Sequence, residues 1–228
     1  MKYDCGCINE LHSSGLTRNV HKCDFHIQWS KDHPQGNSEF YFKDIGALDS
    51  VGIPQFQNHI KEFHHAFDEL GIDLSGRGRA LLEVGFGLGQ YIPLFLAHDW
   101  VYAGIECADY AYSWASAVYG PAVTLIQQKF EHFHDGTSYH TIFGSHAFEH
   151  MTDAPAMLKK AHSLLTSHGQ LWLILPDDGD PTNPDHLWFF NQDTLKGFLK
   201  SIGFVNVRST IRKIVKQENF IYCAAEKG

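Results

Sequence analysis

The residues best suited to bind a ligand lie at positions 80–90, where one acid precedes three glycines at alternate positions. A short apolar run opens this segment and predicts a buried strand, which carries a single acid, Glu83. Gly85, Gly87 and Gly89 follow, and a second apolar run predicts a short buried helix after them. Glycines allow a backbone to approach a ligand closely, and the start of a helix offers unpaired N–H groups. A strand, a glycine turn and a helix in this order predict a cradle of the kind that binds nucleotides.

The spacing of the glycines separates two classes of cofactor. A dinucleotide fingerprint, Gly-x-Gly-x-x-Gly/Ala, would place a small residue where this chain has Gln90. A carboxylate at Glu83 repels a pyrophosphate in a partly desolvated cleft, but it suits a ligand with an ammonium and a sulfonium group. The alternative is that the glycines only form a tight turn between a strand and a helix.

The same segment resembles motif I of the class I S-adenosylmethionine-dependent methyltransferases. The resemblance implies S-adenosylmethionine as the cofactor. It implies contacts with that cofactor from five residues of the segment: Glu83, Gly85, Phe86, Gly87 and Gly89.

A second acid, Glu106, follows the next predicted strand at residues 100–105. Its two oxygens can accept hydrogen bonds from both hydroxyls of a ribose. Dinucleotide folds share this feature, so Glu106 indicates a ribose and no particular cofactor. The resemblance implies that residues 127–131 hold the adenine and that the methionine part lies further along the chain, after the fourth strand. The remaining cofactor contacts that we expect come from Cys107, Phe130, Glu131, Ser145 and His146.

A His-x-x-Glu-His segment at residues 146–150 follows that fourth strand, predicted at residues 139–144. It resembles a segment found in a branch of small-molecule methyltransferases. A methyl group on a sulfonium is already activated, so the protein supplies position and a base for the acceptor, and a histidine suits that role. We expect the base to be His146, His186 or His150, with His150 better suited to bracing the turn. The alternative is that these histidines only hold loops by hydrogen bonds.

The elements that must position these residues alternate between strands and helices along most of the chain. Apolar periodicity predicts helices at residues 55–71, 92–97, 109–118, 154–165 and 195–202. Strands are predicted at 80–84, 100–105, 122–126, 139–144 and 171–175, and Gly169 is expected to end the helix before the last of these. The link between two final strand-like runs, 204–215 and 220–225, is too short for a crossover helix, so this pair is expected to be antiparallel. The resemblance, which covers residues 56–226, implies an α/β doubly wound, mostly parallel seven-stranded sheet with a C-terminal antiparallel hairpin, the Rossmann-like methyltransferase fold.

Residues 1–54 differ from the rest in composition and have few long apolar periodicities. We therefore expect a small irregular segment ahead of a methyltransferase domain at 55–228. Cysteines and histidines gather in this segment, and thiolates and imidazoles suit zinc. The expected zinc ligands are Cys5, Cys7, Cys23 and His26, with His12 and His21 as substitutes. The alternatives are free thiols and surface histidines on an arm, or a lid that closes over the cleft.

The composition limits the class of protein. The chain has 228 residues, of which 43% are hydrophobic, so one α/β domain with a proper core can form. Its formal net charge of −8 argues against nucleic acid as the main partner, because phosphate neutralisation needs clustered Lys and Arg. No run is long and apolar enough to span a membrane, and the first residues lack the apolar core of a signal peptide, so we expect a cytoplasmic protein.

Taken together, these features predict an enzyme that moves a methyl group from S-adenosylmethionine to a hydroxyl or amine of a small molecule. Two alternatives belong to other classes. One is a non-catalytic, methyltransferase-like binding module. The other is a nicotinamide-dependent oxidoreductase, against which Gln90 and the terminal hairpin both count.

Overall fold

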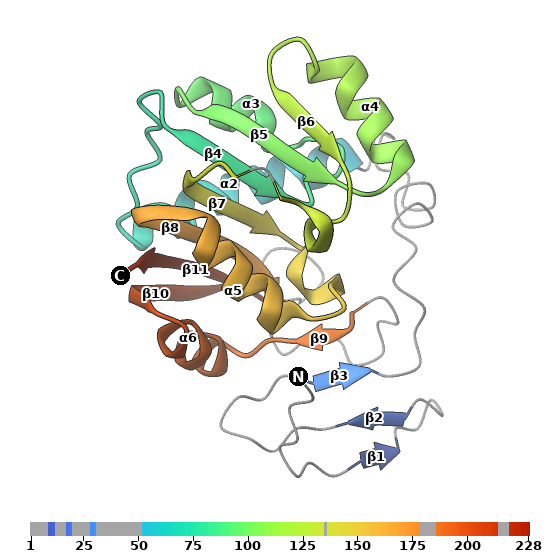
Figure 1. Ribbon diagram of the computed structural model, residues 1–228, viewed down its shortest axis with the longest axis vertical. Helices are drawn as coiled ribbons and strands as arrows, with labels where there is room; N and C mark the ends of the chain where they lie inside the picture. The colour runs from blue at the N-terminus through green and yellow to red at the C-terminus, as the bar shows by residue number, and fades with distance from the viewer. Residues whose placement is uncertain are drawn as a thin grey trace.

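The computed structural model describes the backbone of residues 9–11, 17–19, 28–30, 52–134, 136–177, 186–213 and 219–228, and side chains from His59 onward within these ranges. Its main feature is a seven-stranded sheet in the order β10-β11-β8-β7-β4-β5-β6 (Figure 1). The strands are β4 (Ala80–Val84), β5 (Val101–Glu106), β6 (Thr124–Gln127), β7 (Tyr139–Ser145), β8 (Leu165–Pro176), β10 (Phe204–Lys213) and β11 (Asn219–Lys227). The predicted fold class is therefore confirmed.

The pairing of the strands is parallel in the middle of the sheet and antiparallel at one edge. β4 pairs in parallel with β5 and β7, β5 with β6, and β7 with β8. β11 runs antiparallel to both β8 and β10, as the short link between the last two strands predicts. The carboxyl ends of β4, β5 and β7 therefore meet at one edge of the sheet, where ligands bind in open α/β folds.

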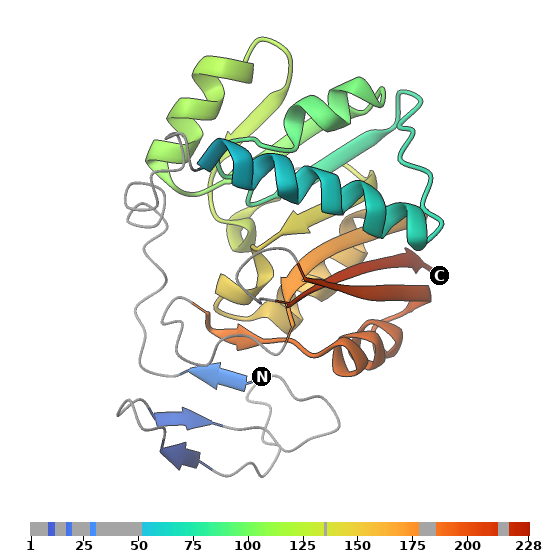
Figure 2. The ribbon, with the colours of Figure 1, turned by 180° about the vertical axis from the view of Figure 1, so that it is seen from behind.

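Helices cover both faces of this sheet. They are α2 (Gly52–Glu69), α3 (Ile92–Ala97), α4 (Asp109–Tyr119), α5 (Ala154–Leu164) and α6 (Gln192–Ser201). Successive residues of β4 serve opposite cores: Leu81 packs with α2 and α3, whereas Leu82 packs with α5 and α6. Seen from behind, α2 crosses the face opposite to α5 (Figure 2). None of the helices in the described ranges has the length and apolar character needed to cross a bilayer.

The boundary between α5 and β8 differs from the sequence prediction. Asp153 caps α5 as expected, since its Oδ1 accepts a hydrogen bond from the Ala156 N–H at 2.9 Å. The helix, however, ends at Leu164 and β8 begins at Leu165, so Gly169 lies within the strand and does not end the helix. The predicted strand at 171–175 matches the buried part of β8. Its earlier residues, Thr166 to His168, are partly or fully exposed and carry no strand-like apolar signal.

A second sheet contains three short strands from the segment that we expected to be irregular. These are β1 (Asn9–Leu11), β2 (Thr17–Asn19) and β3 (Gln28–Ser30), and they pair in the order β1-β2-β3-β9. β9 (Trp188–Phe189) belongs to the link after β8 and pairs antiparallel with β3. The second sheet thus joins the N-terminal segment to a link at the carboxyl edge of the main sheet (Figure 1).

Candidate active site

The glycine turn lies at the carboxyl end of β4 and touches the segment after β7. Gly85, Gly87 and Gly89 all have positive φ angles, of 74°, 54° and 78°. A Cβ atom at Gly85 would lie 2.8 Å from Cβ of Ala147, so the two segments meet without room for a side chain. The contact brings the expected cofactor cradle directly against the His-x-x-Glu-His segment.

Glu106 organises the backbone beside this turn. Its Oε2 accepts a hydrogen bond from the Gly87 N–H at 3.0 Å, and its Oε1 accepts bonds from the N–H groups of Cys107 and Ala108 at 2.7 and 2.8 Å. A carboxylate offers about four acceptor positions, so it retains capacity for a ligand hydroxyl. The acid, the glycine turn and a close backbone approach are the parts that a cradle for the nucleoside of S-adenosylmethionine needs, and the residues present fit that cofactor.

Glu83 lies on the opposite face of β4 from Leu82, beneath the turn. It is fully buried and accepts a hydrogen bond from the Tyr102 hydroxyl at 2.7 Å. Burial raises the pKa of Glu83 to about 8. The hydrogen bond from Tyr102 lowers the pKa in part, and the nearby Glu106 raises it further. The side chain is therefore held as a neutral acid over much of the physiological range, beside Tyr102 of the α2-side core.

The His-x-x-Glu-His segment folds into a 3₁₀ turn, Phe148–His150, that buries its acid. Glu149 is 0% exposed, and its Oε1 lies 3.3 Å from Nδ1 of His146 and 4.0 Å from Nε2 of His150. Burial by itself would raise the pKa of Glu149, but the surrounding histidines, His146 foremost, outweigh burial and hold the pKa below its ordinary value. Glu149 is thus a buried anion at the centre of a histidine cluster.

His186 reaches this cluster from a different part of the chain. Its ring centroid lies 5.0 Å from that of His150. The position follows from the backbone, because the Leu187 N–H donates to the Glu149 carbonyl at 2.8 Å. All three predicted catalytic histidines, His146, His150 and His186, are therefore gathered around one carboxylate that the sequence prediction did not select.

His146 has a strained backbone and a second histidine as neighbour. Its φ is 51°, a left-handed value for a residue with a side chain, and its N–H donates to the Ile174 carbonyl at 2.9 Å. Its ring lies 4.7 Å from that of Phe220 and 6.0 Å from that of His59. Burial, and secondarily His146, lowers the pKa of His59 to about 4, so His59 is neutral at pH 7.

The other predicted cofactor residues occupy varied environments along the same edge. Ser145 is buried, with its Oγ 3.4 Å from the Tyr91 hydroxyl. Phe130 is 3% exposed and packs in the core against Phe148, so its ring is turned inward. Cys107 and Glu131 follow the ends of β5 and β6. The predicted zinc ligands, Cys5, Cys7, Cys23 and His26, lie outside the described side chains.

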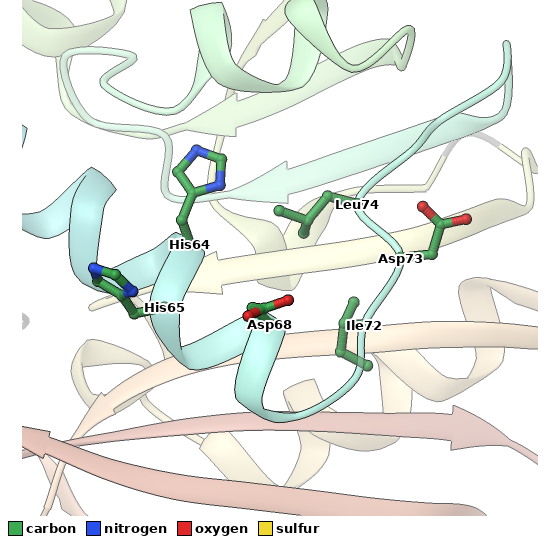
Figure 3. Close-up of a pocket in the computed structure, with 6 residues that line it drawn as sticks. All are labelled: His64, His65, Asp68, Ile72, Asp73 and Leu74. Carbon is green, nitrogen blue, oxygen red and sulfur yellow. The ribbon is translucent and has the colours of Figure 1, made fainter.

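A surface hollow of about 380 Å³ lies near the amino end of β4. It is lined by His64, His65, Asp68, Ile72, Asp73 and Leu74 (Figure 3). These residues belong to α2 and to the loop that leads into the amino end of β4, whereas the glycine turn follows the carboxyl end. The hollow is therefore separate from the candidate active site.

Comparison with known families agrees with this geometry. The sequence profile of a family described as "Methyltransferase domain" matches residues 56–209 of the 228-residue chain. The chain belongs to the class I S-adenosylmethionine-dependent methyltransferases. The matched range includes the glycine turn, Glu106 and the His-x-x-Glu-His segment, and it stops within β10. A search of curated proteins finds no match to the chain.

Solved methyltransferases share the fold at low sequence identity. Magnesium protoporphyrin IX methyltransferase from Synechocystis PCC 6803, with bound S-adenosylhomocysteine, has a TM-score of 0.64 and 15% identity, over 84% of this chain and 98% of that one. The 1,6-didemethyltoxoflavin-N1-methyltransferase from Burkholderia thailandensis has a TM-score of 0.63 and 14% identity, over 91% and 98%. Phosphoethanolamine N-methyltransferase 2 from Haemonchus contortus has a TM-score of 0.63 and 13% identity, over 88% and 61%. At these identities the likeness shows the fold alone.

Proposed function

We propose that this methyltransferase transfers a methyl group to a hydroxyl or amine of a small molecule, and that His146 removes the proton of the acceptor. The observation that supports this role is the environment of the His146 ring. Its Nδ1 faces the carboxylate of Glu149 at 3.3 Å, while its Nε2 is buried without a hydrogen-bond partner among the described residues. A proton held on Nδ1 by Glu149 leaves a lone pair on Nε2 for the acceptor.

His146 is adjacent in sequence to a residue that lies against the expected cofactor cradle. Ala147, the next residue, is in contact with Gly85 of the glycine turn. When bound, S-adenosylmethionine supplies a methyl group on a sulfonium centre. The protein's part is to hold the acceptor beside His146, to accept its proton at Nε2, and to exclude water through the surrounding aromatic rings such as Phe220. His150 lies further from the Glu149 carboxylate, with Nε2 4.0 Å from Oε1, and with His186 it is better suited to hold that turn or a ligand than to act as the base.

The charge of the chain supports a small acceptor. A formal net charge of −8 argues against nucleic acid as the main partner, because phosphate neutralisation needs clustered Lys and Arg. The zinc prediction for the N-terminal segment stays a prediction, which rests on the types of ligand at Cys5, Cys7, Cys23 and His26.

The prediction that the N-terminal segment is a lid gains support from the pairing of β3 with β9, because β9 begins two residues after His186.

The test of the proposal is a screen of small-molecule hydroxyls and amines with methyl-labelled cofactor, followed by variants on the best acceptor. We expect His146→Ala to lower turnover by about 10²–10⁴-fold, with little change in the affinity for S-adenosylhomocysteine. His168→Ala, at the amino end of β8, is the matched control and should keep normal turnover. Near-normal turnover of His146→Ala would show that another group is the base, and cofactor binding with no acceptor in any screen would favour a non-catalytic module.

A further inference from the structure

The carboxylate of Glu149 has only long contacts with histidines among the described residues. Its side chain is fully buried, and neither oxygen makes a hydrogen bond of good geometry with the described residues. Among the described residues, its Oε1 forms ion pairs with Nδ1 of His146 at 3.3 Å and with Nε2 of His150 at 4.0 Å. Burying a charge is costly unless a cation or several hydrogen-bond donors compensate it. Two long contacts to histidines leave room for a cation.

Three potential metal ligands converge at this point. One ligand atom each from Glu149, His150 and His186 lie within 4.8 Å of one another. Metal–nitrogen and metal–oxygen bonds of about 2.0–2.2 Å place neighbouring ligand atoms roughly 3.4 Å apart in a tetrahedral site. The two imidazole rings, whose centroids are 5.0 Å apart, can approach further by rotation of their side chains.

The backbone around the three ligands is fixed by hydrogen bonds from the segment that follows His186. The Leu187 N–H donates to the Glu149 carbonyl at 2.8 Å. Nε1 of Trp188 donates to the Met151 carbonyl at 2.7 Å. These two bonds attach the link after β8 to both sides of the turn that carries Glu149 and His150. The ligand set is therefore assembled by the fold from two separate segments.

We propose that Glu149, His150 and His186 bind a first-row divalent transition-metal ion, for which Zn²⁺ is the best-suited candidate. Two imidazoles and one carboxylate form a common ligand set of catalytic zinc sites, which keep a further position open. Mg²⁺ is a poor match, because it prefers oxygen ligands in an octahedron. The His150 side chain is 35% exposed, so one side of the proposed site is accessible to a ligand from solvent.

A metal ion at this site would favour one class of methyl acceptor. This consequence rests on the proposed function, whereas metal binding itself does not. An ion at Glu149 shares that carboxylate with His146, the proposed base. A hydroxyl in the open coordination position would lose its proton more readily, because a bound cation stabilises the oxyanion. The site therefore favours a hydroxyl acceptor over an amine.

Metal binding is tested on the full chain, stripped with a chelator and titrated with Co²⁺, whose visible absorption reports coordination directly. The titration is done in a Cys5→Ser, Cys7→Ser, Cys23→Ser background, so that thiolates of the N-terminal segment do not contribute. We expect one Co²⁺ per chain, displaced by Zn²⁺ and not by Mg²⁺. His186→Gln and His150→Gln should each weaken binding at least about tenfold. His168→Gln, a histidine outside the cluster, should leave it unchanged.

The readouts separate failure of the metal site from failure of the proposed function. Titration with S-adenosylhomocysteine checks that every variant is folded and retains the cofactor site. Absence of Co²⁺ and Zn²⁺ binding in a chain that still binds S-adenosylhomocysteine would overturn the metal proposal and leave methyl transfer untouched. Equal Co²⁺ binding by His186→Gln, His150→Gln and His168→Gln would also overturn it. Glu149→Gln is a third ligand variant, and it should lose Co²⁺ binding even if its stability is lower.

Discussion

Two fully buried carboxylates, Glu83 and Glu149, have opposite pKa shifts within one active-site edge. Glu83 faces a single hydroxyl, so burial dominates and raises its pKa to about 8. Glu149 faces several histidines, which outweigh burial and lower its pKa. Burial alone therefore does not set the charge of an acid here; the groups that face it do.

The shift of Glu83 makes stability depend on pH. Its pKa is raised from 4.5 in the unfolded chain to about 8 in the folded one, so between these values the folded state holds a proton that the unfolded state releases. Stability from this group is therefore present at low pH and is lost as pH rises toward 8. Glu83→Gln keeps an acceptor for Tyr102 and cannot titrate. Between pH 5 and 8, its free energy of unfolding should therefore fall less steeply than that of the parent protein. The difference in slope should be up to roughly 1.4 kcal/mol per pH unit.

Denaturant unfolding of the cofactor-free chain at several pH values measures this difference. Glu62→Gln, which removes a partly exposed acid of α2, is the control and should track the parent protein. Parallel curves for Glu83→Gln and the parent would mean that Glu83 is not protonated in the folded state.

The sequence could identify the types of residue at the site but not their surroundings. The spacing of Gly85, Gly87 and Gly89 indicates a tight turn, and all three glycines have the positive φ angles that such a turn requires. The central place of Glu149 was missed, since its burial depends on how the turn packs. The approach of His186 was also beyond the sequence, because it depends on a bond between Leu187 and Glu149 across separate segments.

At the scale of elements, the glycine turn and the histidine turn are coupled by one close contact. Gly85 and Gly78 have nearly the same φ, 74° and 76°, but only Gly85 has a neighbour, Cβ of Ala147 at 2.8 Å, where a side chain would go. Alanine at either position should cost about 1–2 kcal/mol for the left-handed backbone. Only Gly85→Ala must also displace Ala147 and the turn that carries His146.

We therefore expect Gly85→Ala to lose at least tenfold in affinity for S-adenosylhomocysteine, and Gly78→Ala to bind normally, in calorimetric titrations of the two variants. Thermal unfolding should show that both variants are less stable than the parent protein, because both have alanine in a left-handed backbone conformation. Gly85→Ala should be the less stable of the two, because it also displaces Ala147. Equal affinity for the two variants would mean that the contact with Ala147 does not shape the cradle.

Element order was predictable because the apolar patterns of buried strands and amphipathic helices are local. The antiparallel end of the sheet followed from the short link between β10 and β11. The start of β8 was not predictable in the same way. Thr166, Ser167 and His168 lie within β8 although they lack apolar alternation, at an irregularity between the pairs Tyr139–Leu165 and Thr141–Gln170.

At the scale of the whole molecule, the topology collects the functional residues on one edge. Parallel strands place the glycine turn, Glu106 and the histidine cluster at neighbouring carboxyl ends. The N-terminal segment contributes a strand, β3, to a second sheet beside the link that carries His186. The candidate site thus combines the expected cofactor cradle with a histidine and carboxylate cluster formed by the turn after β7 and the link after β8.

The most direct test of this account is a calorimetric titration of the chain with S-adenosylhomocysteine and, separately, with NAD. We predict binding of S-adenosylhomocysteine and none of NAD. We also predict that Glu106→Ala weakens the former by roughly 1–3 kcal/mol, because Glu106 holds the backbone N–H of Gly87 and retains an acceptor for a ribose hydroxyl. Tight binding of NAD with no response to S-adenosylhomocysteine would contradict the account.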